Sequence, residues 1–318
     1  MNPFKETFYL DDGFSTTRNA FKIAPEVALG EIKTEQNPED QFETVLFLPE
    51  GECRQGEGGL RTQGYFKKSE SDKPLITVVT VVFNGEAHLE ETILSVINQT
   101  YSNVEYIVID GDSSDRTVDI IRKYEHAIDY WVSEKDGGIY DAMNKAVILT
   151  LGHFLNYMNC GDKFISSEVI NRQLIDRLNS DNYFLGRTLF WFPGRKNEYK
   201  RDIPVLQGES NLEISHQAFF YPLSLHQSLG FYDDKYKSAA DYEFFMRLFL
   251  SRLLRRVVKQ DHFVVIRGKY GDDSSQSFRH VFEMIFIDIK SRVIFFTALK
   301  RIKSLIKLSI SKLMAPFL

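Results

Sequence analysis

The chain has 318 residues, 43% of them hydrophobic and 26% charged, and its formal net charge is -5. This composition is typical of a folded enzyme rather than a disordered chain, and the charge gives no electrostatic footprint for nucleic acid. Two cysteines, Cys53 and Cys160, are too few for a disulfide framework and are compatible with a reducing compartment.

The first residues of the chain carry acids and no apolar run of the kind found in a signal peptide. No uninterrupted apolar segment is long enough to span a bilayer. We therefore expect a cytoplasmic protein, with either one large domain plus extensions or two small domains.

Residues 1–73 have no clear hydrophobic periodicity and are interpreted as an N-terminal appendage of unknown role. Two short apolar runs, 8–10 and 45–48, could form strands. The glycines of 56–61 (GEGGLR) suggest a phosphate-binding loop, but the Lys-Ser/Thr ending and the following helix are missing. A flexible turn is the favoured interpretation.

From residue 74 the pattern predicts alternating strands and helices. The run 75–83 is uncharged and rich in β-branched residues, which suits a buried parallel strand. Further elements are predicted as strands over 104–109, 128–132 and 152–158 and helices over 87–98, 117–124 and 139–149. Short links between such elements are typical of a doubly wound, mostly parallel α/β sheet.

After residue 165 the alternation weakens. Here the sequence predicts helices over 166–178 and 239–254 and strands over 183–192, 217–221 and 262–266.

The apolar run that begins at Gly152 ends in a small polar turn, Cys160-Gly161-Asp162. Ligands of open α/β sheets bind beyond the carboxyl ends of the strands. A carboxylate at that place suits a divalent cation held against a diphosphate. Alternatively, Asp162 only caps the helix that starts near Ser166.

Four motifs in this order resemble the family-2 glycosyltransferases, which have the GT-A fold. They are 79–85 (VTVVFNG), 95–101 (SVINQTY), 108–117 (VIDGDSSDRT) and 138–145 (GIYDAMNK). The last motif, with 133–136 (SEKD) ahead of it, is similar to the bacterial subgroup that builds O-antigen, capsule and other exopolysaccharides. The resemblance covers residues 74–254 and implies a Rossmann-like sheet with flanking helices. It divides a 74–270 domain into a nucleotide-sugar half (74–165) and an acceptor half (166–270).

The resemblance implies a donor site at the strand ends. Val81 and Phe83 take the positions that cradle the nucleotide base, and Asp110 that of the carboxylate accepting a hydrogen bond from the base. Asp136 takes the place of a carboxylate near the sugar or ribose. The alternatives are structural: Asp110 caps the turn to Ser113, and Asp136 caps its own loop.

Asp162 matches the last acid of the family's metal-binding Asp-x-Asp motif, which implies Mg²⁺ or Mn²⁺ as cofactor. Cys160 stands in the place of the first acid, and a thiol is a poor ligand for a hard cation. One carboxylate with donor phosphates and waters is still normal coordination for Mg²⁺.

A second motif, 238–247 (SAADYEFFMR), resembles the family's acidic motif, in which an aspartate opens a helix and an arginine follows. Asp241 takes the position of the base that removes a proton from the acceptor hydroxyl. Arg247 takes the position of the arginine, Ala240 replaces the usual glutamate, and Glu243 is the reserve base. Asp241 would also suit the helix dipole in a purely structural role.

The segment 214–220 (ISHQAFF) has a similar form in the same subgroup and is expected to line the acceptor side through His216 and Gln217. His216 either binds an acceptor hydroxyl or phosphate or satisfies a buried turn.

The last part of the chain, 271–318, is interpreted as a basic amphipathic helical tail. After Asp288 there are no acids and several lysines and arginines, with Leu299, Ile302 and Ile306 in one helical stripe. Such a helix lies in a membrane interface, or else packs on protein with its lysines solvated.

The resemblance as a whole implies an inverting, metal-dependent hexosyltransferase that uses a nucleotide-diphosphate sugar, with UDP favoured. Its expected acceptor is a lipid-linked glycan at the inner face of the plasma membrane. A sugar nucleotidyltransferase and an inactive nucleotide-sugar-binding scaffold remain as alternatives. The first strand runs into Asn84-Gly85-Glu86 rather than a Gly-rich basic loop, which counts against the nucleotidyltransferase.

Overall fold

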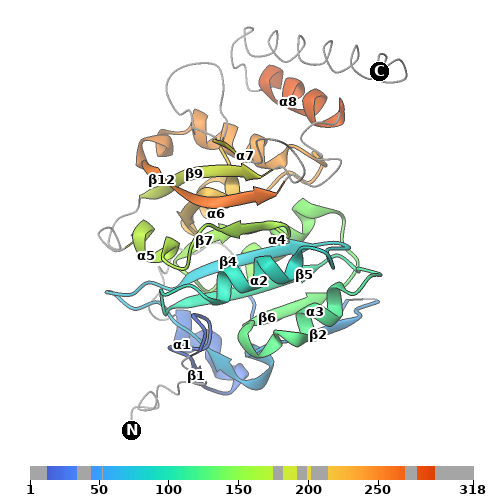
Figure 1. The fold of residues 1–318 in the computed structure, drawn as a ribbon, viewed down its shortest axis with the longest axis vertical. Coiled ribbons are helices and arrows are strands. Elements are labelled where there is room, and N and C mark those ends of the chain that lie inside the picture. The colour runs from blue at the N-terminus through green and yellow to red at the C-terminus, as the bar shows by residue number, and fades with distance from the viewer. Residues whose placement is uncertain are drawn as a thin grey trace.

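A single large sheet with helices on both faces organises the molecule (Figure 1). The structure is a computed structural model that describes residues 13–33, 44–51, 53–174, 182–191, 199–201, 214–268 and 278–290. The strand order is β2-β6-β5-β4-β7-β11-β9-β12-β8, with β10 paired to β9, and β1 and β3 form a separate pair.

The helices are α1 (Pro25–Lys33), α2 (Leu89–Ile97), α3 (Thr117–Lys123), α4 (Ile139–Leu149), α5 (Val169–Leu174), α6 (Ser224–Leu229), α7 (Ala240–Leu250) and α8 (Phe278–Lys290). The strands are β1 (Phe21–Lys22), β2 (Gly56–Gly58), β3 (Tyr65–Phe66), β4 (Ile76–Val82), β5 (Val104–Asp110), β6 (Tyr130–Ser133), β7 (Phe154–Tyr157), β8 (Asp162–Phe164), β9 (Tyr183–Trp191), β10 (Tyr199–Arg201), β11 (Phe219–Pro222) and β12 (Val257–Gly268).

The middle of the sheet is parallel: β6, β5, β4 and β7 are neighbours in that order and run in one direction. Every residue of β4 and β5 is buried, because helices cover both faces. Alternate side chains of β4 belong to two different core clusters. Val78 and Val82 share one with residues of α2 and α3, and Val79 and Val81 share the other with residues of α4 and α7. This two-sided burial explains why the strands read as continuous apolar runs.

The predicted elements between 75 and 158 are confirmed to within a few residues at their ends. Beyond them the sheet is mixed. β11 pairs antiparallel with β7 and β9, β9 pairs parallel with β12, and β12 pairs antiparallel with β8. The strand predicted over 262–266 extends over Val257–Gly268, and β8 was not predicted.

The glycine-rich stretch predicted as a flexible turn is instead the edge strand β2, paired antiparallel with β6. Its glycines are needed because Trp131 of β6 lies against them: a Cβ on Gly58 would come within 2.6 Å of the Trp131 Nε1 atom, and one on Gly56 within 2.8 Å of its ring. The expected strand over 45–48 is not formed, and the run 8–10 lies outside the described residues.

The N-terminal segment is also tied to the amino-terminal edge of the parallel strands. Arg61 pairs with Glu105 at 2.7 Å, and Lys67 Nζ lies 2.5 Å from Asp129, all four side chains being almost fully buried. Burial lowers the pKa of Lys67 and raises that of Asp129. The described part of 1–73, expected to be an appendage, therefore belongs to the same folded unit.

At the other end of the chain, α8 covers part of α7 (Figure 1). Residues 291–318, which carry most of the predicted basic tail, lie outside the described residues. Among the helices described, none has both the length and the apolar character needed to cross a bilayer.

Candidate active site

The parallel strands end at one edge of the sheet, and their following turns carry the candidate site residues. Residues 83–85 follow β4, 111–113 follow β5, 134–138 follow β6 and 158–162 follow β7. Each of these turns contains a residue with positive φ: Asn84 at 49°, Asp112 at 71°, Gly138 at 114° and Gly161 at 91°. The chain thus reverses sharply at the edge where open α/β sheets bind ligands.

Asp110, the last residue of β5, is fully buried and accepts three hydrogen bonds. Its donors are the Ser113 amide at 3.0 Å, the Ser113 hydroxyl and the Ser133 hydroxyl at 2.6 Å. The capping role proposed as its alternative is therefore present in the structure. The role in base recognition stays a prediction.

Asp136 lies beside Asp110, in the turn after β6. Its Oδ1 accepts a hydrogen bond from the Gly138 amide at 2.8 Å, and a Cβ on Gly111 would come within 2.6 Å of its Oδ2. Burial raises the pKa of Asp136. Gly111 therefore leaves room for this half-buried carboxylate next to the end of β5.

Val81 and Phe83 differ in exposure. Val81 is buried in the core, whereas the Phe83 ring is 66% exposed directly after β4. An exposed aromatic ring at a strand end is suited to stacking on a nucleobase, because every base has a π face.

Asp162 follows β7 and is nearly buried. Its Oδ2 accepts a hydrogen bond from Gln217 Nε2 at 2.7 Å, and the Ser215 hydroxyl donates to the Gln217 Oε1 at 2.8 Å. Gln217 belongs to a 3₁₀ turn, His216–Ala218, that leads into β11. Because β11 runs antiparallel to β7, this turn lies at the carboxyl end of β7.

Asp241 opens α7 and faces the same turn. Its Oδ2 lies 3.2 Å from His216 Nδ1, and its Oδ1 accepts hydrogen bonds from the Tyr140 hydroxyl at 2.9 Å and the Tyr242 amide at 2.8 Å. Asn159 Nδ2 lies 3.1 Å from His216 Nε2, so both ring nitrogens of His216 have a partner. These are the contacts expected of a histidine that satisfies a buried turn. The role of His216 in binding the acceptor stays a prediction.

Burial acts to raise the pKa of Asp241. The hydrogen bonds and charge interaction with His216, together with the bonds from Tyr140 and the Tyr242 amide, outweigh it and hold the pKa well below its usual range. A carboxylate has about four lone-pair positions. Three are used here, and the side chain is still 22% exposed, so one remains for a substrate hydroxyl.

The two candidate acids are linked through consecutive residues. Gln217 holds Asp162, and His216 holds Asp241. Asn159 belongs to the turn that ends at Asp162 and completes the link by contacting His216. The structure thus brings together, beside β7 and β11, residues that lie far apart in the sequence.

Arg247 is held by a different set of contacts. Its guanidinium contacts the Glu243 carboxylate, with Nε 2.9 Å from Oε2, and the carbonyl oxygens of Leu229 and Phe231. It also lies over the Phe244 ring. These contacts fix the loop between α6 and α7, so Arg247 has a complete structural role, and Glu243, the reserve base, is committed to it.

Tyr140 and Asn159 are site residues that the sequence interpretation did not single out. Burial raises the pKa of Tyr140 far above its usual value, so the hydroxyl stays protonated and donates to Asp241. Tyr140 lies inside the recognised motif 138–145, at the start of α4, and Asn159 directly precedes the recognised turn Cys160-Gly161-Asp162, after β7. Position within or beside those motifs was the only sequence signal available.

Two solved structures resemble this fold. TarS residues 1–349 of S. aureus in complex with UDP-GlcNAc superposes with a TM-score of 0.55 at 19% identity, covering 74% of this chain and 71% of that one. The mannosyltransferase PcManGT of Pyrobaculum calidifontis in complex with GDP-Man and Mn²⁺ gives 0.54 at 14% identity, covering 73% and 70%. The fold is therefore of the GT-A type.

Sequence comparison gives the family. The glycosyl transferase family 2 model matches residues 77–231. An uncharacterized glycosyltransferase of Mycobacterium tuberculosis is 33% identical over 185 residues, 55% of this chain and 68% of that protein. A PGL/p-HBAD biosynthesis glycosyltransferase of Mycobacterium bovis is 28% identical over 199 residues, 60% of this chain and 75% of that protein. The chain belongs to glycosyltransferase family 2.

Proposed function

We propose that this chain transfers a sugar, with inversion, from a nucleoside-diphosphate sugar to a hydroxyl of a lipid-linked glycan in bacterial surface polysaccharide synthesis. The observation that carries the proposal is the link from Asp162 through Gln217 and His216 to Asp241. It supports the proposal because it joins Asp162, which would face the diphosphate end of the donor, to Asp241, which would deprotonate the acceptor.

The residues of the chain divide the work. Phe83, Asp110 and Asp136 would bind the nucleotide, with Phe83 stacking on the base and the carboxylates receiving hydrogen bonds. Asp241 would take the proton of the attacking hydroxyl as the new glycosidic bond forms. Tyr140 and His216 hold the Asp241 carboxylate in one orientation throughout.

A divalent cation fits the donor side of this arrangement through Asp162. Within the residues that the structure describes, no three His, Cys, Asp or Glu side chains converge on one point. Burial raises the pKa of Cys160 to about 12, which leaves the thiol neutral and a poor ligand. One carboxylate with substrate phosphates and waters is normal for Mg²⁺, and the bound cation would offset charge on the leaving diphosphate.

A thermal-shift panel tests the donor site. UDP, GDP, dTDP and CMP are each added with Mn²⁺ and with EDTA. We expect UDP with Mn²⁺ to raise the melting temperature by several degrees, because a ligand at about 100 times its dissociation constant adds about 2.7 kcal/mol of stability. TarS was solved with UDP, and PcManGT with GDP-Man. The absence of any shift would contradict the proposed donor site, and a shift with GDP alone would reassign the donor.

The outer face of α8 supports action at a lipid surface. Phe282, Phe286 and Ile289 lie in one helical stripe and are 60%, 60% and 64% exposed. Both acids of the helix point inward: Glu283 accepts hydrogen bonds from the Lys237 and Ser238 amides, and Asp288 from the Tyr242 hydroxyl. The exposed side is therefore apolar and basic, as in helices that bind anionic interfaces.

Vesicle binding tests this surface. The double variant Phe282→Ser/Phe286→Ser is expected to weaken binding to phosphatidylglycerol-containing vesicles about 10-fold, because less apolar area enters the interface. Val27→Ser is the control, since Val27 is a 51% exposed apolar residue on α1, near the other end of the chain. Equal binding by the wild type and the double variant in a flotation assay would contradict the assignment.

A further inference from the structure

A short N-terminal segment, residues 54–57, reaches the same sheet edge as the donor-site turns. The Gln55 amide donates to the Ser133 carbonyl oxygen at 2.8 Å, and the β2 strand then pairs with β6. The Gln55 side chain contacts Asp112 in the turn after β5. This segment therefore touches two of the four turns that form the candidate site.

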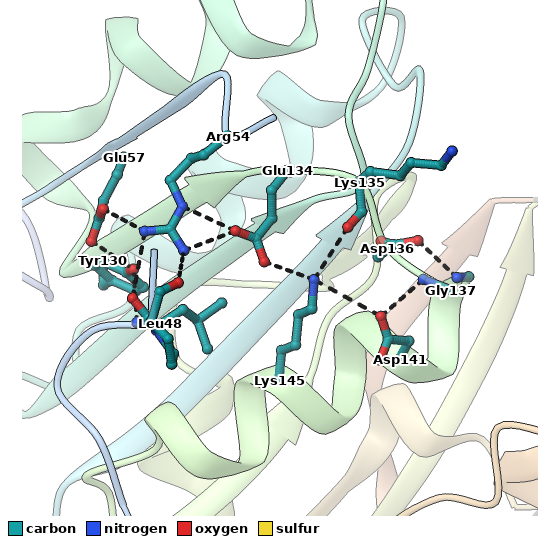
Figure 2. Close-up of polar contacts among 12 residues, drawn as sticks. Leu48, Arg54, Glu57, Tyr130, Glu134, Lys135, Asp136, Gly137, Asp141 and Lys145 are labelled. Atoms are coloured by element: carbon teal, nitrogen blue, oxygen red, sulfur yellow. Dashed lines mark hydrogen bonds and ion pairs between the residues drawn. The ribbon is translucent and has the colours of Figure 1, made fainter. Parts of the chain in front are cut away.

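Arg54 joins this segment to the 134–138 turn (Figure 2). Its Nε and Nη2 donate to Glu134 Oε2 at 2.9 and 2.8 Å, and its Nη1 donates to Glu57 at 2.7 Å. From the other side, Lys145 Nζ of α4 donates to Glu134 Oε1 at 2.8 Å. Burial alone would raise the pKa of Glu134, but Lys145 and Arg54 outweigh it and lower the pKa.

Glu134 begins the turn that carries Asp136. The far end of this turn is held as well, since the Gly137 amide donates to Asp141 Oδ2 at 2.9 Å. In Figure 2 the chain of contacts runs from Arg54 through Glu134 and Lys145 to Asp141 and Gly137. Asp136 lies between two fixed points. Arg54 clamps the start of the turn from the N-terminal segment; the Glu134 amide also donates to the Asp110 carbonyl oxygen at 3.1 Å, and Lys237 Nζ donates to the Gly137 carbonyl oxygen at 3.2 Å.

Arg54 lies outside residues 77–231, which the family model matches. The other buried cations of the N-terminal segment, Arg61 and Lys67, hold the opposite edge, where β5 and β6 begin. Arg54 is therefore placed differently from the cations that only join the segment to the sheet. Arg is suited to this task because its planar fork binds one carboxylate through two donors.

We propose that Arg54 is a positioning residue for the donor site: by clamping Glu134 against Lys145, it fixes the 134–138 turn and places Asp136 for the nucleotide sugar. The inference rests on the proposed donor site, and it makes the N-terminal segment a part of that site's support. Removal of a supporting contact of this kind from a binding site costs about 10-fold or more in affinity, by analogy with the outer contacts of metal sites.

The test uses the full chain and isothermal titration with UDP, GDP and dTDP in the presence of Mn²⁺. Arg54→Met keeps the side-chain stem and removes the fork. We expect the dissociation constant of the nucleotide that binds the wild type to rise about 10-fold. Amide exchange in residues 134–138 is expected to become faster at the same time. Arg54→Lys keeps the charge without the fork, and its dissociation constant is expected to lie between those of the wild type and Arg54→Met.

Thr16→Val is the matched control for general destabilisation. The Thr16 hydroxyl donates to the Ala127 carbonyl oxygen at 2.7 Å, ahead of β6 and at the opposite edge of the sheet. This variant is expected to lower the melting temperature and to leave both the dissociation constant and the exchange of 134–138 unchanged. If Arg54→Met folds poorly, Glu134→Gln removes the charge from the same contact and is measured instead.

The outcomes separate the two hypotheses. A wild type that binds none of the nucleotides refutes the proposed donor site, and this inference with it. A wild type that binds one, together with Arg54→Met binding equally well or showing unchanged exchange, refutes the role of Arg54 alone. An equal loss of affinity in Thr16→Val would likewise overturn it, because the effect would then follow stability rather than the clamp.

Discussion

Asp241→Asn is expected to lower kcat about 10³-fold while changing nucleotide affinity less than 2-fold, since a positioned general base contributes about 10² to 10⁴. Asparagine fills the same space and can still accept from Tyr140 and the Tyr242 amide, but it cannot take a proton. Single-turnover rates and UDP binding, measured on the same preparation, separate the two effects.

Glu243→Gln is the matched control, because Glu243 is an acid on the same helix and is paired with Arg247. It is expected to lower thermal stability, because Arg247 loses a charged partner, and to leave kcat within about 3-fold, because the contacts described for the Glu243 carboxylate are with Arg247. A loss of turnover in Glu243→Gln, with Asp241→Asn active, would exchange the two roles.

The pH dependence of activity follows from the hydrogen bonds around Asp241. Its pKa is depressed, so the carboxylate is ionised above that pKa and is lost only when the pH falls through it. The wild type is therefore expected to keep its base ionised at pH values below about 3.9, the ordinary pKa of an aspartate. His216→Gln or Tyr140→Phe removes one donor, raises the pKa and moves the acid limb of the rate profile to higher pH.

A carboxylate held this strongly is a weak base toward a free hydroxyl. The acceptor oxygen becomes much more acidic as its bond to the anomeric carbon forms, so transfer to Asp241 becomes favourable late in that step. Keeping Asp241 ionised and oriented then matters more than raising its basicity. This explains how three donors around one carboxylate can serve the reaction.

The parallel half of the fold was predictable because its signal is local. Two-sided burial makes β4 and β5 continuous apolar runs, and each run ends where the polar turn must begin. Asp110, Asp136 and Asp162 could be placed at one edge from this pattern alone, since the carboxyl ends of parallel strands meet there.

The rest depends on contacts between distant segments, which no local pattern encodes. Gln217 and Asp162 are 55 residues apart, and Tyr140 and Asp241 are 101 apart. Arg247 matched a motif, yet its contacts with Leu229 and Phe231 became visible only once α6 and α7 were packed. The glycines of β2 suggested a flexible turn because Trp131, the residue that requires them, lies more than seventy residues further along the chain.

Asp162→Asn is expected to lower kcat/KM about 10³-fold, because a bound cation supplies several kcal/mol of charge stabilisation and about 4 kcal/mol is three decades in rate. The asparagine still fits beside Gln217, but it removes the only charged oxygen ligand that this turn offers the diphosphate side. The same variant is expected to lose the difference between Mn²⁺ and EDTA in UDP binding, which identifies the defect as one of cation binding rather than folding.

Cys160→Ser provides the matched control in the same turn. The Cys160 thiol lies 3.7 Å from the Gly85 carbonyl oxygen, and a serine hydroxyl retains the polar contact without adding a charge. If Asp162 alone carries the cation for the protein, Cys160→Ser keeps its metal dependence, with kcat/KM within about 3-fold, since a thiol gives a hard cation little. Wild-type turnover that persists unchanged in EDTA would remove the cation from the mechanism. Asp162 would then only orient Gln217, and the adjoining residue His216 would orient the base, Asp241.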